Sequence, residues 1–356
     1  MAALGLRPAL GSARAPVSAL EVARHVGALQ AQDYQSGVWS IGVRSGLTLE
    51  QVERSVVERE VVRTWPMRGT IHFVPAEDAR WMSRLLAGRQ LAALGTRYRQ
   101  LNLTDPEVER AGQLFEDHLT EPMSRPDVAA LLCDNGIDPS GQRAYHLVGH
   151  HCMTGLLCQG PLRGRQPTFV RIDSWVPHSR APSREEGLAT VVERYVRSHG
   201  PVTEKDVAGW MSQPLGLARE ALALLGDRLV REEVDGVTWL THVDASPPAP
   251  SGSVLLLPQW DELLLGYKSR HVSLPDEHLA RVVPGRNMVF QPSVVIDGEV
   301  AGLWRRRQTT STTHLEVELF NQASDARWAA IETAAAAYGR FLGRPVKVVD
   351  ATRQGA

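Results

Sequence analysis

The stretch Leu29-Gln30-Ala31-Gln32-Asp33 contains two glutamines that are two residues apart. On a continuing helix their side chains would point roughly 200° apart, whereas on an extended chain both point the same way. The apolar stripe of the preceding predicted helix ends at Leu29, so we expect the conformation to change here. Two converging amides can hold a water molecule through their carbonyl oxygens and present a dipole to developing positive charge. The alternative is a pair of surface glutamines at a helix end.

Asp33 follows directly and is the natural rival for a chemical role, because a carboxylate can act as a general base. If the segment is extended, Asp33 points away from Gln30 and Gln32. We therefore expect Asp33 to have a structural or capping role.

Other chemical motifs are weak. His150, His151, Cys152 and Cys158 are close in sequence, but the paired CxxC or HExxH spacing of zinc sites is absent, so we expect no metal. No phosphate-binding loop, GxGxxG or GxSxG is found, and no cofactor is expected. The adjacent acids Asp261-Glu262 would point to opposite faces of a strand, which does not support a two-carboxylate glycosidase site.

The elements around the glutamines follow a recognisable order. The predicted elements are helices from Ser18 and from Thr48, then strands over 61–65 and 70–74 with a turn over 67–69. Glu21 and Gln51 each stand three residues after the first residue of their helix, which is the spacing of a capping box. Helices followed by a hairpin are the order of a winged helix.

The same order is expected twice more along the chain. The second set comprises helices over 105–119, 124–132 and 143–157 and a glycine-rich hairpin over 160–170. The third comprises helices over 186–198, from Thr203 and over 215–225, and a hairpin over 229–240 that turns at Asp235-Gly236. This repetition predicts three winged helices in tandem, with an ordinary α+β protein containing mixed hairpins as the alternative.

A linker by composition, residues 244–253, precedes a β-rich stretch. Its predicted elements are strands over 254–257, within 282–289, over 293–296, 299–303 and 313–320, a helix over 324–342 and a strand over 346–349. Several antiparallel strands with one closing helix predict a small barrel.

The predicted fold class is therefore α+β, with three tandem winged-helix modules and a C-terminal small β-barrel. The expected modules are winged helix 1 with the glutamine motif over 1–100, winged helix 2 over 101–180, winged helix 3 over 181–243, and the barrel with its closing helix over 254–350.

Composition is that of a folded soluble chain: 356 residues, 43% hydrophobic and 22% charged. The longest apolar runs are too short to span a bilayer, so no membrane partner is expected, and no secretory signal is visible. The three cysteines Cys133, Cys152 and Cys158 cannot form a disulfide framework and fit a reducing compartment. These features predict a cytoplasmic protein.

The charge balance needs separate consideration, because the formal net charge is −1 with 39 basic residues. Only Lys205, Lys268 and Lys347 are lysines, and the other basic residues are arginines. Genomic base composition accounts for most of this bias. Arginine forks also suit phosphate oxygens, and near-zero net charge permits DNA binding if the arginines cluster on one face.

Four stretches together resemble a bacterial family of winged-helix DNA-binding proteins: LQAQD at 29–33 followed by Trp39, VVRTWPMRGTIHFVPAEDARW at 61–81, LLLPQWDELLLGYKSR at 255–270 and VVIDGEVAGLWRRR at 294–307. Within that family, Gln-aliphatic-Gln resembles the catalytic motif of the AlkZ branch, whereas a related branch carries Gln-aliphatic-Asp. Because Gln32 is the second position here, the chain is similar to the AlkZ branch. Ser269 departs from the acid found in many relatives.

The resemblance implies three tandem winged helices, a β-barrel and a concave DNA-binding channel. It also implies hydrolysis of the N-glycosidic bond of N7-alkylated purines in double-stranded DNA, including unhooking of azinomycin-type interstrand crosslinks. Gln30 and Gln32 are the expected catalytic pair, and we expect a nucleoid-associated monomer.

Candidate DNA contacts come from wings and hairpins. They are Arg63, Arg68 and His72 in the first wing, Arg143 and His146 at the start of the second recognition helix, and Arg305, Arg306 and Arg307 after a barrel hairpin. Hairpins around Gly285–Met288 or Asp297-Gly298 are candidates to probe the minor groove. Two other functions remain open: a winged-helix transcriptional regulator without enzymatic activity, and a non-catalytic lesion-binding protein.

Overall fold

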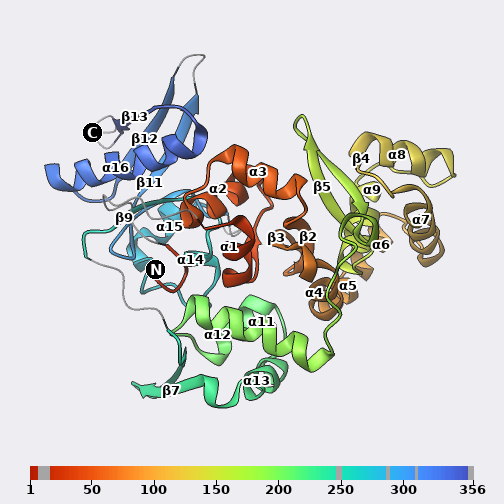
Figure 1. The fold of residues 1–356 in the computed structure, drawn as a ribbon, viewed down its shortest axis with the longest axis horizontal. Coiled ribbons are helices and arrows are strands. Elements are labelled where there is room, and N and C mark those ends of the chain that lie inside the picture. Colours follow the sequence, from red (N-terminus) through yellow and green to blue (C-terminus); the bar gives the residue numbers. More distant parts are fainter. Residues whose placement is uncertain (7–16, 246–250, 286–288, 309–311, 352–356) are drawn as a thin grey trace. The chain divides into compact units, whose positions relative to one another are not determined.

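The structure is a computed structural model that describes residues 1–6, 17–245, 251–285, 289–308 and 312–351 (Figure 1). The chain forms two compact units, each built from segments that are distant in sequence. The first comprises Met1–Val52, Arg194–Trp210 and Asp227–Ala356, and the second comprises Glu53–Glu193 and Met211–Gly226. The boundary after Val52 lies inside the predicted first module, so these units are not the predicted modules, whose limits stay a prediction.

The first run of elements contains α1 (Ala19–Val26), β1 (Leu29–Gln30), α2 (Tyr34–Ser45), α3 (Leu49–Val57), β2 (Val61–Met67) and β3 (Thr70–Pro75). Both predicted capping boxes are confirmed. The Ser18 hydroxyl accepts the Glu21 N–H while the Glu21 side chain accepts the Ser18 N–H. Thr48 and Gln51 make the same exchange.

Helices that the sequence analysis did not assign follow β3. They are η1 (Ala76–Asp78), α4 (Ala79–Leu86), α5 (Gly88–Ala93) and α6 (Gly95–Gln100). The second run then contains α7 (Asp105–His118), β4 (Met123–Ser124), α8 (Arg125–Asp134), α9 (Arg143–Met153), β5 (Leu157–Arg163), β6 (Gln166–Arg171) and α10 (Ile172–Trp175). Helix α9 is shorter than predicted, because Gly155, with a φ of 72°, intervenes before the chain extends into β5.

The third run contains α11 (Arg184–His199), α12 (Glu204–Met211), α13 (Leu215–Ala223), η2 (Gly226–Arg228), β7 (Leu229–Val234) and β8 (Val237–His242). The predicted hairpin turn is confirmed at Asp235 and Gly236, whose φ angles are 52° and 73°. All three runs therefore place helices before a hairpin, in the order that the sequence predicts.

In the second unit, two hairpins join into one antiparallel sheet. Its strands are hydrogen-bonded in the order β3-β2-β5-β6-β4. The junction is the pairing of β2 with β5, where Arg63 lies opposite Gln159. Arg63 thus sits in the middle of this sheet rather than at the tip of a wing.

The C-terminal part of the first unit is a sheet with strand order β13-β12-β11-β10-β9. The strands are β9 (Val254–Leu257), β10 (Ser293–Ile296), β11 (Glu299–Gln308), β12 (Thr313–Leu319) and β13 (Val346–Asp350), with helices α14 (Glu262–Leu265), η3 (Asp276–His278), α15 (Leu279–Val282) and α16 (Asp325–Leu342). The predicted hairpin turn at Asp297 and Gly298 is confirmed by φ angles of 53° and 95°.

The predicted closed barrel is not formed by the strands that the structure describes, since β9 and β13 are the two edges of this sheet. Strands β12 and β13 pair in parallel, so the chain must cross over between them, and α16 makes that crossover. Helix α16 contacts both edge strands and occupies the face across which they would have to meet. The strand expected within 282–289 is also missing from its described residues: α15 ends at Val282, and 286–288 lie outside the description.

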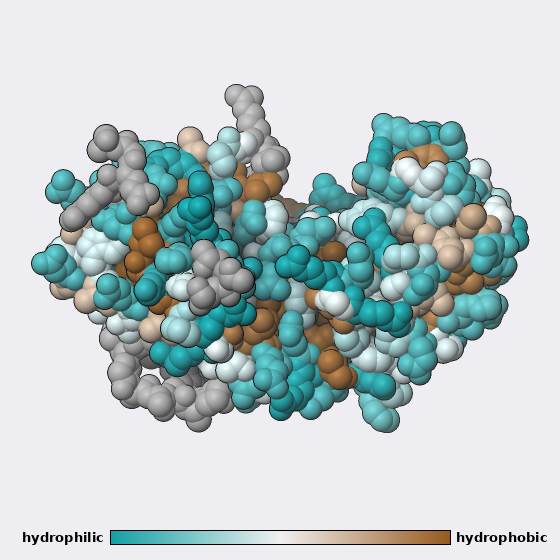
Figure 2. Space-filling view, turned by 90° about the horizontal axis from the view of Figure 1, so that it is seen from above, coloured by the Kyte–Doolittle hydropathy of each residue, from teal (hydrophilic) through white to brown (hydrophobic). Residues whose placement is uncertain are grey.

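The core of this part is apolar and includes the amino-terminal residues Leu4 and Leu6, which are fully buried with Leu257, Val295 and Phe290. Hydrophilic side chains cover most of the face seen in Figure 2, with apolar residues in separate patches. In the described part of the chain, no helix is both long and apolar enough to cross a bilayer.

Candidate active site and nucleic-acid interface

The glutamine motif lies between two helices of the first unit. Helix α1 ends at Val26, three residues earlier than its apolar stripe suggests, because Gly27 adopts a φ of 88° that ends the helix. Gly27 also packs closely: a Cβ there would lie 3.3 Å from the Trp210 ring. Gln30 is then in β1, so the predicted extended conformation is confirmed at this position.

Burial alternates along this segment. Leu29 and Ala31 are fully buried, whereas Gln30 is half-buried and Gln32 is exposed. Both glutamines therefore lie on the side that is open to solvent, as an extended chain requires. The Gln32 N–H donates to Gln30 Oε1 at 3.2 Å. This bond orients the amide of Gln30 along the segment that carries Gln32.

Asp33 caps helix α2, as the sequence predicted. Its Oδ1 accepts the Ser36 N–H at 2.8 Å, and its backbone is extended with φ −90° and ψ 121°. The carboxylate is thus turned towards the helix that follows the glutamines, where a capping oxygen stabilises the first turn.

Helix α2 is anchored to the C-terminal part of the first unit at two points. The Trp39 Nε1–H donates to the carbonyl of Leu256 at 2.8 Å, and its ring lies 4.7 Å from that of Tyr338. Nearer the helix end, Arg44 forms a buried two-pronged ion pair with Asp261, at 2.7 and 2.9 Å. The motif therefore precedes a helix whose position is fixed by the core of the unit.

Glu262, the second acid of the pair considered above, has a separate buried partner. It accepts the Trp210 Nε1–H at 2.8 Å, and Asp261 caps α14 rather than lying on a strand. Both acids serve packing contacts, so this pair does not form a two-carboxylate site.

The first-wing candidates are mostly internal. Arg63 is 5% exposed, with its guanidinium 5.8 Å from the Phe73 ring, and His72 is fully buried. The His72 ring bonds to the Thr70 carbonyl and to Arg68 at 2.8 Å. Arg63 on β2 and His72 on β3 are therefore internal, and their part in phosphate binding stays a prediction. Arg68, half-buried at the turn, stays a prediction.

Arg143 is also largely internal. Its guanidinium is buried and donates to the carbonyls of Asp138, Leu101 and Asn102 and to the Glu107 carboxylate. Arg143 thus ties the start of α9 to the start of α7, and its part in phosphate binding stays a prediction. Helix α9 itself packs against β2, α4 and α5.

His146, the other candidate on α9, is half-buried. Its Nε2 accepts from Arg97 Nε at 3.4 Å. Burial and then the Arg97 charge lower the pKa of His146 below its usual value, so the ring is neutral near pH 7. The part of His146 in DNA binding stays a prediction. Its partner Arg97 is a residue that the sequence analysis did not single out.

Arg305, Arg306 and Arg307 are exposed near the end of β11. Because side chains alternate along a strand, Arg306 lies on the opposite face from the other two. Arg306 reaches the Tyr338 hydroxyl at 3.4 Å, on the α16 side. Arg307 lies 3.5 Å from Glu316, on the other side. At most two of the three can therefore serve one surface.

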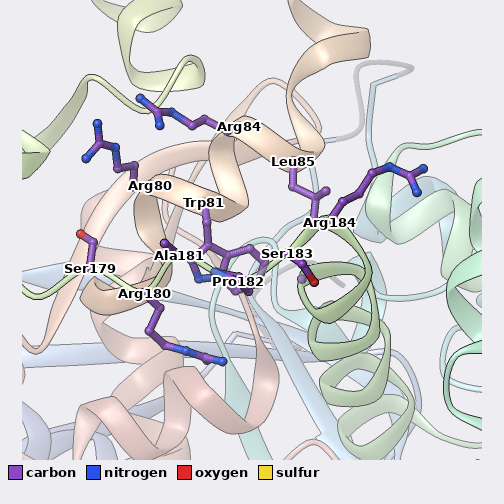
Figure 3. A pocket seen from close by; sticks show the side chains of 11 residues that line it. Arg80, Trp81, Arg84, Leu85, Ser179, Arg180, Ala181, Pro182, Ser183 and Arg184 are labelled. Carbon is purple, nitrogen blue, oxygen red and sulfur yellow. The ribbon is translucent and has the colours of Figure 1, made fainter.

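A cavity of about 530 Å³ in the second unit is lined by α4, residues 179–183 and the start of α11 (Figure 3). Arg80 and Arg84 lie on one side of it, and Arg180 and Arg184 point away from them. Arg80, Arg180 and Arg184 are paired with Asp173, Asp78 and Glu220, respectively. Little net charge remains, so we assign no ligand to this cavity.

The residues considered for a metal are used in packing. His151 Nε2 bonds to the Val108 carbonyl at 2.9 Å, and His150 Nδ1 bonds to the Tyr98 hydroxyl at 2.9 Å. Cys152 and Cys158 are fully buried, and burial raises the pKa of both thiols. Across the described ranges, no three His, Cys, Asp or Glu side chains converge on a metal position.

The chain belongs to the family described as DNA glycosylase AlkZ-like, which matches residues 23–341. An interstrand DNA cross-link repair glycosylase of Streptomyces sahachiroi is 28% identical over 313 residues, 82% of this chain and 83% of that protein. The solved structure of Streptomyces sahachiroi DNA glycosylase AlkZ covers 98% of both chains with a TM-score of 0.79 and 23% identity, which shows a shared fold. The family resemblance inferred from the sequence is confirmed.

The sequence analysis missed one charged segment. Residues 79–104 contain Arg80, Arg84, Arg89, Arg97 and Arg99 and no acid. A stretch of this length with average composition would hold about three acids, since the chain has 40 in 356 residues. Counting charges in a sliding window would have found it.

Proposed function

We propose that this protein is a monofunctional DNA glycosylase that releases N7-alkylated purines from double-stranded DNA, with Gln30 and Gln32 positioning the attacking water. The observation that carries the proposal is the pair of glutamines on the open side of the short segment between α1 and α2, in a chain of the AlkZ-like family.

The chemistry suits neutral amides. An N7-alkylpurine already bears a positive charge, so it leaves without a general acid, and its departure develops an oxocarbenium-like sugar. Glutamine cannot deprotonate water, but its carbonyl oxygen can hold the water and stabilise positive charge. Gln30 Oε1 accepts one hydrogen bond from the Gln32 N–H and has a second lone pair for the water.

Unhooking of interstrand crosslinks is part of the proposal. The Streptomyces sahachiroi relative is named an interstrand DNA cross-link repair glycosylase. A crosslinked base is tethered to the opposite strand and cannot rotate fully into a deep pocket, unlike a flipped base. The exposure of Gln32 supports a shallow site that such a base can approach.

We further propose that the three runs of helices and hairpins are tandem winged helices. The second run supports this most directly: β4, between α7 and α8, pairs with β6, and β6 pairs with β5 in the hairpin that follows α9. Because α9 is covered on several sides, DNA would be bound by surfaces other than a recognition helix of the usual kind.

Single-turnover base release tests the function. The substrates are duplexes of one sequence that carry N7-methylguanine, an N7–N7 crosslink or uracil. We expect release of the two cationic lesions and negligible release of uracil. Uracil release at a comparable rate would contradict the leaving-group argument. Lesion binding without release would favour a non-catalytic lesion-binding protein, and binding of undamaged operator-like DNA alone would favour a regulator.

A further inference from the structure

The acid-free segment 79–104 forms helices α4, α5 and α6 on the second unit. Arg80 at its start is paired with Asp173, so its charge is offset locally. Arg89, Arg97 and Arg99 are on α5 and α6, where none of them has a carboxylate partner among the described residues. Arg84, on α4, donates to the Thr154 carbonyl and likewise has no carboxylate partner among the described residues. Four of the five arginines of this segment therefore keep their charge.

Arg97 makes the most hydrogen bonds of these cations. Its Nε donates to His146 Nε2 at 3.4 Å, one terminal nitrogen donates to Gln100 Oε1 at 3.1 Å, and the other donates to Gln142 Oε1 at 2.6 Å. All three acceptors are neutral. An arginine has five N–H donors, so two remain for a ligand.

This arrangement differs from that of Arg143, which lies on α9 with His146. Arg143 is neutralised by Glu107, and three more of its five N–H donors go to backbone carbonyls. Arg97 is instead held in place by groups that leave its charge intact, and that charge contributes to the lowered pKa of His146. Holding the side chain in advance lowers the entropy cost of binding an anion.

We propose that Arg97 is a phosphate-binding site for the DNA backbone. A guanidinium whose partners are neutral matches a phosphodiester, because the anion meets no competing carboxylate and receives charge-assisted hydrogen bonds. Gln142 and His146 position the guanidinium. The assignment rests on the proposed function for the identity of the ligand as DNA.

The experiment is a salt titration of binding to an undamaged duplex, followed by fluorescence anisotropy. Arg97→Gln should make the slope of log K against log salt less steep by about 1, as expected when the protein neutralises one phosphate fewer. Arg110→Gln is the matched control, since Arg110 is an exposed arginine of the same unit on α7, beside Glu109. It should leave the slope unchanged. Arg97→Lys keeps the charge and should keep the slope.

Two results overturn the site: equal slopes for Arg97→Gln and Arg110→Gln, or an equal reduction of slope in Arg97→Lys and Arg97→Gln, which would mean that the side chain acts through the fold. The assay does not require base release. If the wild-type protein binds DNA through Arg97 but releases no base, only the proposed catalysis is contradicted. If the enzyme is active but Arg97→Gln leaves the salt slope unchanged, only this site is contradicted.

Discussion

At the scale of single residues, the glutamine pair would place the attacking water without activating the leaving group, whereas a pair of carboxylates usually does both. The side chains of Gln30 and Gln32 lie on the open side of the segment between α1 and α2, and both amides are neutral at every pH of the working range. Water placement is thereby assigned to amides, and activation of the leaving group is assigned to the lesion itself.

Replacing either glutamine should therefore slow chemistry without weakening binding. We expect Gln30→Ala or Gln32→Ala to reduce the single-turnover rate about 10- to 1000-fold, the size of losing one positioned polar group, with little change in the Kd for lesion DNA. Gln35→Ala is the matched control, because Gln35 is an exposed glutamine on the first turn of α2. Full activity in the Gln30→Ala, Gln32→Ala double variant would remove the pair from the mechanism.

Asp33 gives a sharper test of the same division of tasks. Asparagine caps a helix about as well as aspartate, so Asp33→Asn should retain the rate and the thermal stability. Asp33→Ala should lose about 1 kcal/mol of stability with the cap bond to Ser36. If Asp33→Asn abolished base release and changed the pH profile of the rate, Asp33 would be a general base and the capping role would be insufficient.

At the scale of elements, β11 distributes its arginines over two faces. Arg305 and Arg307 share one face, whereas Arg306 lies on the α16 side near Tyr338. We expect the Arg305→Gln, Arg307→Gln double variant to make the salt dependence of DNA binding less steep, by about 1 for each phosphate that is no longer neutralised. Arg306→Gln serves as the comparison and should change it less. A larger effect of Arg306→Gln would place the DNA on the opposite face of the strand.

Local signals predicted elements well. The capping boxes at Ser18 and Thr48 and the turns at Asp235 and Asp297 were readable because their partners lie within a few residues. The extended glutamine segment was readable for the same reason, since helix period and strand period place residues two apart differently.

The features that the sequence did not predict depend on contacts between residues that are far apart in the sequence. The barrel stays open because α16 spans the two edge strands, a packing that no local pattern specifies. Arg143 looked like an exposed cation at a helix start, but it is buried by Glu107 and by carbonyls about 40 residues away in sequence. The pairing of β2 with β5 likewise buried Arg63, a residue whose type alone favours the surface.

At the scale of the whole molecule, the free energy of unfolding should depend on pH through a buried histidine. Burial lowers the pKa of His151 to about 4, with the neighbouring His150 adding to this and the Val108 carbonyl opposing it. An unfolded histidine titrates near 6.5, so unfolding takes up a proton between these values. The contribution is present above pH 6.5 and is lost as pH falls towards 4.

The expected loss across that window is of order 3 kcal/mol, measured by urea unfolding at a series of pH values. His151→Leu has no proton to take up, so its unfolding free energy should change less between pH 6.5 and 4.5. The variant also loses the bond to Val108, which lowers stability at every pH. A pH dependence as steep as that of the wild-type protein would contradict the neutral buried state of His151.

The anchoring of α2 has a consequence for hydrogen exchange. Trp39 ties the helix to β9 and Arg44 ties it to Asp261, so its amides cannot open to solvent unless contacts with the C-terminal sheet are also broken. Backbone amides from Gly37 to Ser45 should then exchange about as slowly as those of β9, through the same cooperative opening. Helix α2, next to the glutamines, is in that case fully ordered once the protein has folded, and DNA binding has no ordering cost to meet there.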